Sequence, residues 1–231
     1  MPAKKRPGKN PADKIVVKSK AYGEHTRAPR GSKSRAVLNP AMKAHGQRLR
    51  KSNMPAKLIM DALQPYRENF KGGMLWQRLV KHFAAQAKKG DVYSIAGIEH
   101  WDLNERYFTS RLMTTRVKIE PDNLFSNLEV RVNYVFSKRF LERRKAIQSF
   151  RVTMIFLFPD FKKNEIITDP VVLPDKLLSD TAPYEFIVPI PRRANSYLVC
   201  FKAEACAHGE LHQISPNVDK AMCLIGSGMR E

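Results

Sequence analysis

The sequence predicts an α+β fold in which a basic N-terminal arm and a helical hairpin precede an antiparallel β-sandwich or open β-barrel. Lys, Arg, Pro and Gly are frequent at the start of the chain, and apolar residues then recur at helical spacing. From about residue 110, apolar and polar residues alternate, as is typical of strands. We therefore expect a flexible basic arm over residues 1–38, a helical region over 39–91 and an antiparallel β domain over 92–231.

Positive charge is concentrated in the arm and in the first helix. The 231 residues have a formal net charge of +19, and the first 53 contain fifteen Lys and Arg but only two acids, Asp13 and Glu24. The remaining 178 residues carry only about +6. Such a local excess of cations favours binding to a polyanion, and nucleic acid is the first candidate.

The candidate phosphate-binding residues are the cations of the arm and first helix, together with a second basic segment at 137–145. They are Lys4, Lys5, Arg6, Lys9, Arg27, Arg30, Lys33, Arg35, Lys43, Arg48, Arg50, Lys51, Arg139, Arg143 and Arg144. A solvated loop or short helix without a binding role is the alternative for the second segment.

Helix signals begin at Asn39-Pro40, because Asn can cap a helix and Pro fits its first position. We expect this helix to end near residue 51 and a second one to start at Ser52-Asn53, ahead of Pro55. A further apolar stripe predicts a helix from about 75 to 88. The later two helices are expected to form a hairpin with a shared apolar face.

The alternating pattern predicts strands over 128–136, 150–158, 186–190, 197–205 and 221–225, with one further short strand at Ile15–Val17. Segment 150–158 is apolar on both faces, so we expect it to be central and buried on both sides. In segment 197–205, Lys202 and Glu204 are expected to face solvent. The aromatic residues Tyr134, Phe150, Phe156 and Tyr197 can stack on bases if exposed, but the core is the expected place for them.

The sequence contains no motif that predicts catalysis or a cofactor. Cys206, His208 and His212, with Cys223 nearby, are zinc-type ligands, but their spacing matches no usual zinc finger. The polar segment 97–107 contains Glu99, His100 and Asp102, and we expect it to connect the helices to the strands, with Trp101 as a packing anchor. No phosphate-binding loop, dinucleotide fingerprint or nucleophile elbow occurs. We therefore expect a non-enzymatic protein without cofactor or metal.

Cysteine use and hydropathy indicate the compartment. Three cysteines form an odd set without a CxxC pair, which fits a reducing cytoplasm. No apolar run is long enough to cross a bilayer, and no apolar segment follows the basic start as a secretory signal requires. We expect a cytoplasmic protein without a membrane partner.

The stretch RAVLNPAMKAHGQRLRKSNMPAKLIMDALQPYREN, which starts at Arg35, resembles a family of uncharacterised basic proteins from Bacteroidetes. That family has a basic arm, a D/N-P-A-F-x-R-T-R-E-N segment, two helices and a β-rich C-terminal half. Here Asn39-Pro40-Ala41-Met42 and Arg48 match the segment, whereas Arg50-Lys51 stands where the family has E-N. The family has no known activity, so the resemblance implies only the architecture and a non-enzymatic role.

Two function hypotheses follow. The first is a non-enzymatic nucleic-acid-binding protein, with RNA favoured over DNA because an arm broken by Pro and Gly suits folded RNA. The alternative is a structural or assembly subunit of a larger particle, with the arm lying on an acidic protein surface.

Overall fold

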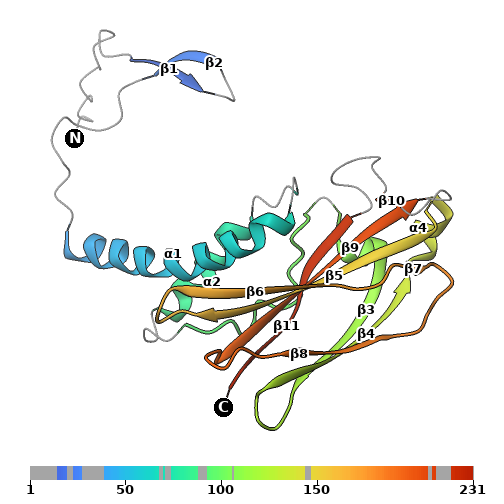
Figure 1. Ribbon diagram of the computed structural model, residues 1–231. Helices are drawn as coiled ribbons and strands as arrows, with labels where there is room; N and C mark the ends of the chain where they lie inside the picture. Colours follow the sequence, from blue (N-terminus) through green and yellow to red (C-terminus); the bar gives the residue numbers. More distant parts are fainter. Residues whose placement is uncertain are drawn as a thin grey trace, which may run out of the picture. The chain divides into compact units, whose positions relative to one another are not determined.

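The computed structural model describes residues 15–19, 23–27, 39–67, 70, 74–87, 93–105, 107–143, 147–207, 210–211 and 220–230 (Figure 1). The chain divides into two compact units, Met1–Lys43 and Ala44–Glu231. Within the first unit, β1 (Ile15–Ser19) pairs with β2 (Gly23–Arg27) as an antiparallel hairpin.

The helices of the described chain are α1 (Pro40–Arg67), α2 (Leu75–Gln86), α3 (Thr109–Leu112) and α4 (Lys138–Arg143). The strands of the larger unit are β3 (Met113–Pro121), β4 (Asn127–Phe136), β5 (Ser149–Asp160), β6 (Glu165–Val172), β7 (Lys176–Leu177), β8 (Tyr184–Pro189), β9 (Ser196–Ala207), β10 (Glu210–Leu211) and β11 (Lys220–Met229).

These strands form two antiparallel sheets. The larger sheet has the order β10-β9-β5-β6, with β11 also paired to β9 and β7 also paired to β5. The smaller sheet has the order β3-β4-β8. Apolar residues of both sheets pack into one buried cluster between them, so the predicted α+β fold with a C-terminal β-sandwich is confirmed.

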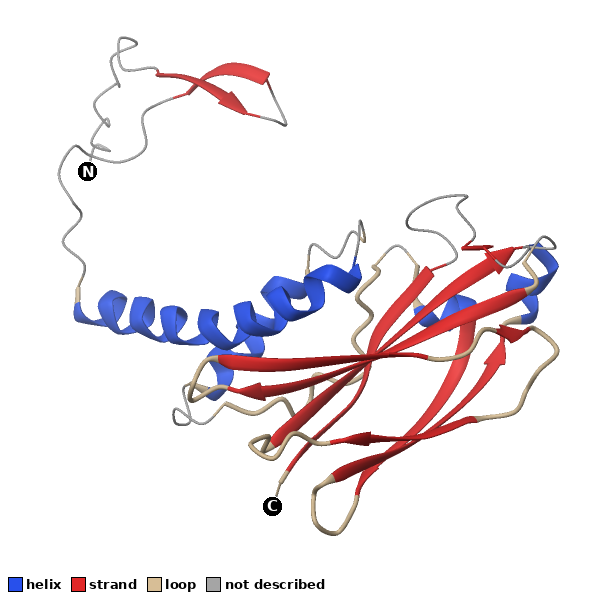
Figure 2. Cartoon of the chain, in the orientation of Figure 1, coloured by secondary structure: helices blue, strands red, loops and turns tan. Residues whose placement is uncertain are grey.

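A second apolar cluster joins α1 and α2 to the other face of the larger sheet (Figure 2). The central strand β5 contributes to both clusters: Phe156 packs between the sheets, while Ile155 and Leu157 pack beneath the helices. All three side chains are fully buried. This confirms that segment 150–158 is a central strand buried on both sides.

α1 is one continuous helix, so the predicted break at Ser52-Asn53 is wrong. Its predicted start is confirmed, because the Asn39 side-chain oxygen accepts a hydrogen bond from the Met42 N–H at 2.8 Å. The helix continues through Pro55, although proline removes one backbone hydrogen bond. Ala56 and Ile59 pack fully buried against the sheet on the same face, and this packing outweighs the local signal to stop.

The sequence pattern did not predict β3 and β6, and it assigned the wrong environment to part of β9. β6 contains Pro170, which is tolerated because β6 is the last strand at its edge of the described sheet. Lys202 and Glu204 were expected to face solvent, but they are buried with 7% and 5% of their surface exposed. They continue the face of Leu198 and Cys200, which is the face covered by the helical layer.

Candidate nucleic-acid interface

The first turns of α1 present exposed basic residues of the larger unit. Residues 44–51 are all exposed, and alternation with buried positions begins only at Ser52. Figure 1 shows this part of α1 extending past the edge of the larger sheet. The larger sheet therefore does not cover the helix over these turns.

Three of the eight residues on these turns are Lys or Arg, and none is acidic. Arg48 and Arg50 are exposed, and no carboxylate of the described chain pairs with either guanidinium. Lys51 and Lys57 are exposed on the turns that follow. The first acidic residue of α1 is Asp61, so the charged side chains of its N-terminal half are all basic. Arginine donates up to five hydrogen bonds in a planar fork that suits phosphate oxygens.

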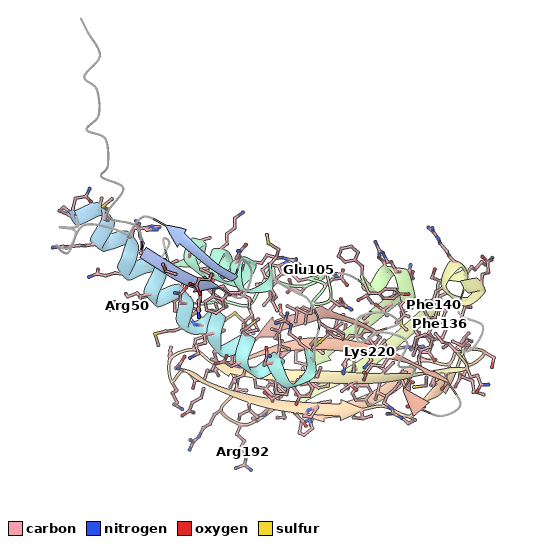
Figure 3. The ribbon with its side chains drawn as sticks, turned by 90° about the horizontal axis from the view of Figure 1, so that it is seen from above. Arg50, Glu105, Phe136, Phe140, Arg192 and Lys220 are labelled. Atoms are coloured by element: carbon pink, nitrogen blue, oxygen red, sulfur yellow. The ribbon has the colours of Figure 1, made fainter. Side chains whose placement is uncertain are left out.

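The structure keeps the two predicted basic segments apart. Arg139 is exposed on α4, and Lys138 beside it is exposed as well. Figure 3 shows Arg50 on α1 at one end of the molecule and Phe140 of α4 at the other. The two segments therefore do not combine into one surface within the larger unit.

The other predicted cations lie in the smaller unit or outside the described residues. Lys43 is exposed near the start of α1, and Arg27 is the last residue of β2. The predicted residues outside the described part are Lys4, Lys5, Arg6, Lys9, Arg30, Lys33, Arg35 and Arg144, together with the side chain of Arg143.

The aromatic residues considered for base stacking are all in the core. Tyr134, Phe150, Phe156 and Tyr197 are buried in the cluster between the sheets. Burial raises the pKa of Tyr134 to about 12, and the Asp180 carboxylate adds to this effect. A buried ring offers no face to a base, so the stacking role is excluded for these residues.

The outer face of the smaller sheet is unsuited to phosphate. A groove of about 710 Å³ lies there, and its charged lining is mixed in sign. Lys118 pairs with Glu120 at 2.6 Å, and Arg131 pairs with Glu185 at 3.2 Å. Glu129 also lines the groove, so three carboxylates face two cations. This balance repels a polyanion.

The segment between α2 and α3 packs as a connection, as predicted. The Arg78 guanidinium lies 4.4 Å above the Trp101 ring, and the His82 ring meets Trp101 edge-on at 6.1 Å. Trp101 is thus the expected packing anchor. Glu99 accepts a hydrogen bond from the Ser227 hydroxyl, which attaches the connection to β11, and another from the Gly97 N–H within the connection.

The candidate metal ligands are not assembled in the described part of the chain. Cys206 and Cys223 are buried free thiols, and His208 and His212 lie outside the described residues. Burial raises the pKa of the Cys223 thiol to about 12, and burial also raises the pKa of the Cys206 thiol. Within the described residues, no group of three or more His, Cys, Asp or Glu side chains is placed to hold a metal ion.

Sequence reasoning missed a buried ionic cluster on the helix-facing side of the larger sheet. The Glu204 Oε1 lies 3.2 Å from the Lys202 Nζ and 3.3 Å from the Lys220 Nζ. The exposed fraction is 5% for Glu204, 7% for Lys202 and 9% for Lys220. The Asn104 amide donates to the Lys220 carbonyl oxygen at 2.8 Å and fixes the start of β11 beside this cluster. The spacing of Lys202 and Glu204 on one strand face was the available signal.

Comparison with known proteins does not place the chain in a family. No protein-family model and no curated protein matches it. The resemblance to the Bacteroidetes proteins therefore stays a prediction. None of the helices that the structure describes combines the length and the apolarity needed to cross a membrane.

Proposed function

We propose that the protein is a non-enzymatic nucleic-acid-binding protein, with a basic N-terminal arm and the first turns of α1 as its phosphate contacts. The observation that carries the proposal is the distribution of charge: fifteen Lys and Arg against two acids in the first 53 residues. The exposure of Arg48 and Arg50 on α1 supports it, because cations contribute to binding only where phosphates can reach them.

Affinity is expected to be largely independent of sequence and to fall steeply with salt. Each phosphate that the protein neutralises releases condensed counterions, so the logarithm of the binding constant decreases with the logarithm of the salt concentration. A protein with about six phosphate contacts loses roughly a thousandfold in affinity between about 50 and 200 mM salt.

The test is a filter-binding titration of the full chain at several salt concentrations. The probe is a mixture that contains DNA and RNA, each in duplex and in single-stranded form. A variant without residues 1–38 keeps the Asn39 cap of α1 and tests the arm. We expect the deletion to weaken binding and to reduce the salt slope. Contacts between cations and phosphates are strong at about 50 mM salt, so absence of binding by the full chain under that condition would contradict the proposal.

A structural or assembly role is the second candidate, and one observation favours it. The strands at the described edges of both sheets expose large apolar side chains: Val172 of β6 is 63% exposed and Ile187 of β8 is 66% exposed. Edge strands with exposed apolar residues are surfaces on which further chains can pair. Size-exclusion chromatography with light scattering tests this role: a nuclease-resistant oligomer supports it, and a monomer at all concentrations rejects it.

A further inference from the structure

The shape of α1 indicates which form of nucleic acid it fits. We propose that the exposed turns of α1 enter the major groove of B-form duplex DNA, with Arg48 and Arg50 contacting the phosphates or base edges of the groove. This inference rests on the proposed function and deepens it by naming the partner, which is duplex DNA and not the RNA expected from the sequence of the arm.

The exposed turns of α1 match the major groove of B-form DNA in size. Residues 44–51 are exposed throughout, and eight residues of α-helix span about 12 Å with a diameter of about 10–12 Å including side chains. The major groove of B-DNA is about 12 Å wide and about 8.5 Å deep, so it admits a helix. The major groove of A-form RNA is too deep and narrow for side chains to read.

The cations of α1 project in several directions from the helix. Arg50 precedes the buried Ile59 by nine residues, which is two and a half helical turns, so Arg50 projects away from the sheet. Lys57 follows Arg50 by seven residues and lies on the same outward side, about 10.5 Å further along the axis. Arg48 precedes Ile59 by eleven residues, about three full turns, so it projects from the opposite side of the helix to Arg50. A helix in a groove has a phosphate backbone on each side, and cations in several directions suit that environment.

The exposed turns of α1 lack the aromatic rings that a single-stranded partner requires. Single-strand binding relies on exposed aromatic rings beside a basic groove. α1 contains no Phe, Tyr or Trp before Tyr66. The four strand aromatics that can stack on bases are buried. The described basic surface thus offers charge and shape without a stacking platform.

The test compares the affinities of the full chain for duplex DNA, duplex RNA, single-stranded DNA and single-stranded RNA of equal length at one salt concentration. The test variant is Arg48→Ala/Arg50→Ala. Both side chains are exposed and alanine is a strong helix former, so the fold is retained. The matched control is Arg192→Ala/Arg193→Ala, which removes the same charge from exposed residues after β8. Figure 3 shows Arg192 well separated from Arg50.

We expect duplex DNA to bind at least about tenfold more tightly than the other three, and the test variant to lose about tenfold or more while the control loses about threefold or less. Methyl green, which occupies the major groove, should compete with the protein, whereas netropsin in the minor groove should not. Equal binding of all four nucleic acids, or equal losses in the two variants, overturns this inference and leaves the proposed function standing. Failure to bind any of the four nucleic acids would contradict both this inference and the proposed function.

Discussion

At the scale of single residues, Glu204 contacts both Lys202 and Lys220 on the helix-facing side of the larger sheet. Its Oε1 lies within ion-pair distance of both ammonium groups, although the geometry is not that of a hydrogen bond. Removing the carboxylate from a buried ion pair is costly because its attraction to the ammonium groups is lost in a poorly hydrated site. We expect Glu204→Gln to lower the free energy of unfolding by about 3 kcal/mol in urea titrations.

The control for this prediction is Glu185→Gln. Glu185 pairs with Arg131 at 3.2 Å, but both side chains are more than half exposed. Exposed pairs contribute about 0.2–1 kcal/mol, so the control should change the free energy of unfolding by less than 1 kcal/mol. Equal losses in the two variants would mean that the cluster around Glu204 contributes no more than a surface pair.

Glu99 gives a prediction about acid stability. Burial alone raises its pKa, but hydrogen bonds from the Ser227 hydroxyl and the Gly97 N–H lower it by more, so the net pKa is below its usual value. A carboxyl with a depressed folded-state pKa contributes its stability above its unfolded pKa of about 4.3, and this stability is lost as the pH falls through the lower folded-state value.

We therefore expect Glu99→Gln to be less stable than the parent protein by about 1 kcal/mol at neutral pH, and this difference should shrink as the pH falls below about 4. Urea unfolding at a series of pH values measures it. Glu129→Gln, at an exposed position on β4, is the control and should show little effect at any pH. A difference that stays constant with pH would show that the ionised state of Glu99 is not what stabilises the connection.

At the scale of elements, two glycines give opposite expectations for the same substitution. Gly46 lies on an exposed turn of α1, and a Cβ added there meets nothing within 4 Å. Because glycine in a helix interior costs about 1 kcal/mol relative to alanine, Gly46→Ala should stabilise this part of α1. Hydrogen exchange of the amides in 46–51 should slow about fivefold, and unchanged exchange would show that Gly46 does not limit the helix.

Gly228 lies on β11, directly over the ring of Tyr197. A Cβ at Gly228 would lie 2.5 Å from Tyr197 Cζ, and Tyr197 is buried between the sheets. The ring must shift for the new methyl group, which typically costs about 1–3 kcal/mol in a packed core. Gly228→Ala should lower the urea midpoint, whereas Gly46→Ala should not. A neutral result would mean that the C-terminal end of β11 moves without cost.

At the scale of the whole molecule, two of the three free thiols report on the two packed clusters. Cys200 belongs to the cluster under the helices, and Cys223 belongs to the cluster between the sheets. Burial raises the pKa of both thiols, so neither is expected to react in the folded protein. Because β9 and β11 pair directly and contribute to both clusters, the layers should unfold together.

Thiol labelling in increasing urea, followed by peptide mass spectrometry, tests this expectation. Cys200 and Cys223 should become reactive over the same urea range as the loss of helical circular dichroism. Earlier reaction of Cys200 alone would show that the helical layer separates from the sandwich before the sandwich unfolds.

Much of the architecture could be predicted from sequence because its signals are local. The Asn39 cap, the helical stripe over residues 75–86 and the two-sided apolar pattern of β5 each lie within a few consecutive residues. The break expected at Ser52-Asn53 was wrong, because packing of Ala56 and Ile59 on the sheet overrides a local signal. The same limit applies to Lys202 and Glu204, whose alternation shows that they share a face but not that the face is covered.

The sequence by itself determined the order of elements, the α+β class and the concentration of positive charge near the N-terminus, because periodicity and net charge depend only on neighbouring residues. Only the tertiary structure decided that the first turns of α1 extend past the sheet with Arg48 and Arg50 exposed, and that α4, on which Phe140 is labelled, lies at the other end of the larger unit. It also brought Lys220 to Glu204 across paired strands. These features depend on contacts between distant parts of the chain, which no local pattern contains.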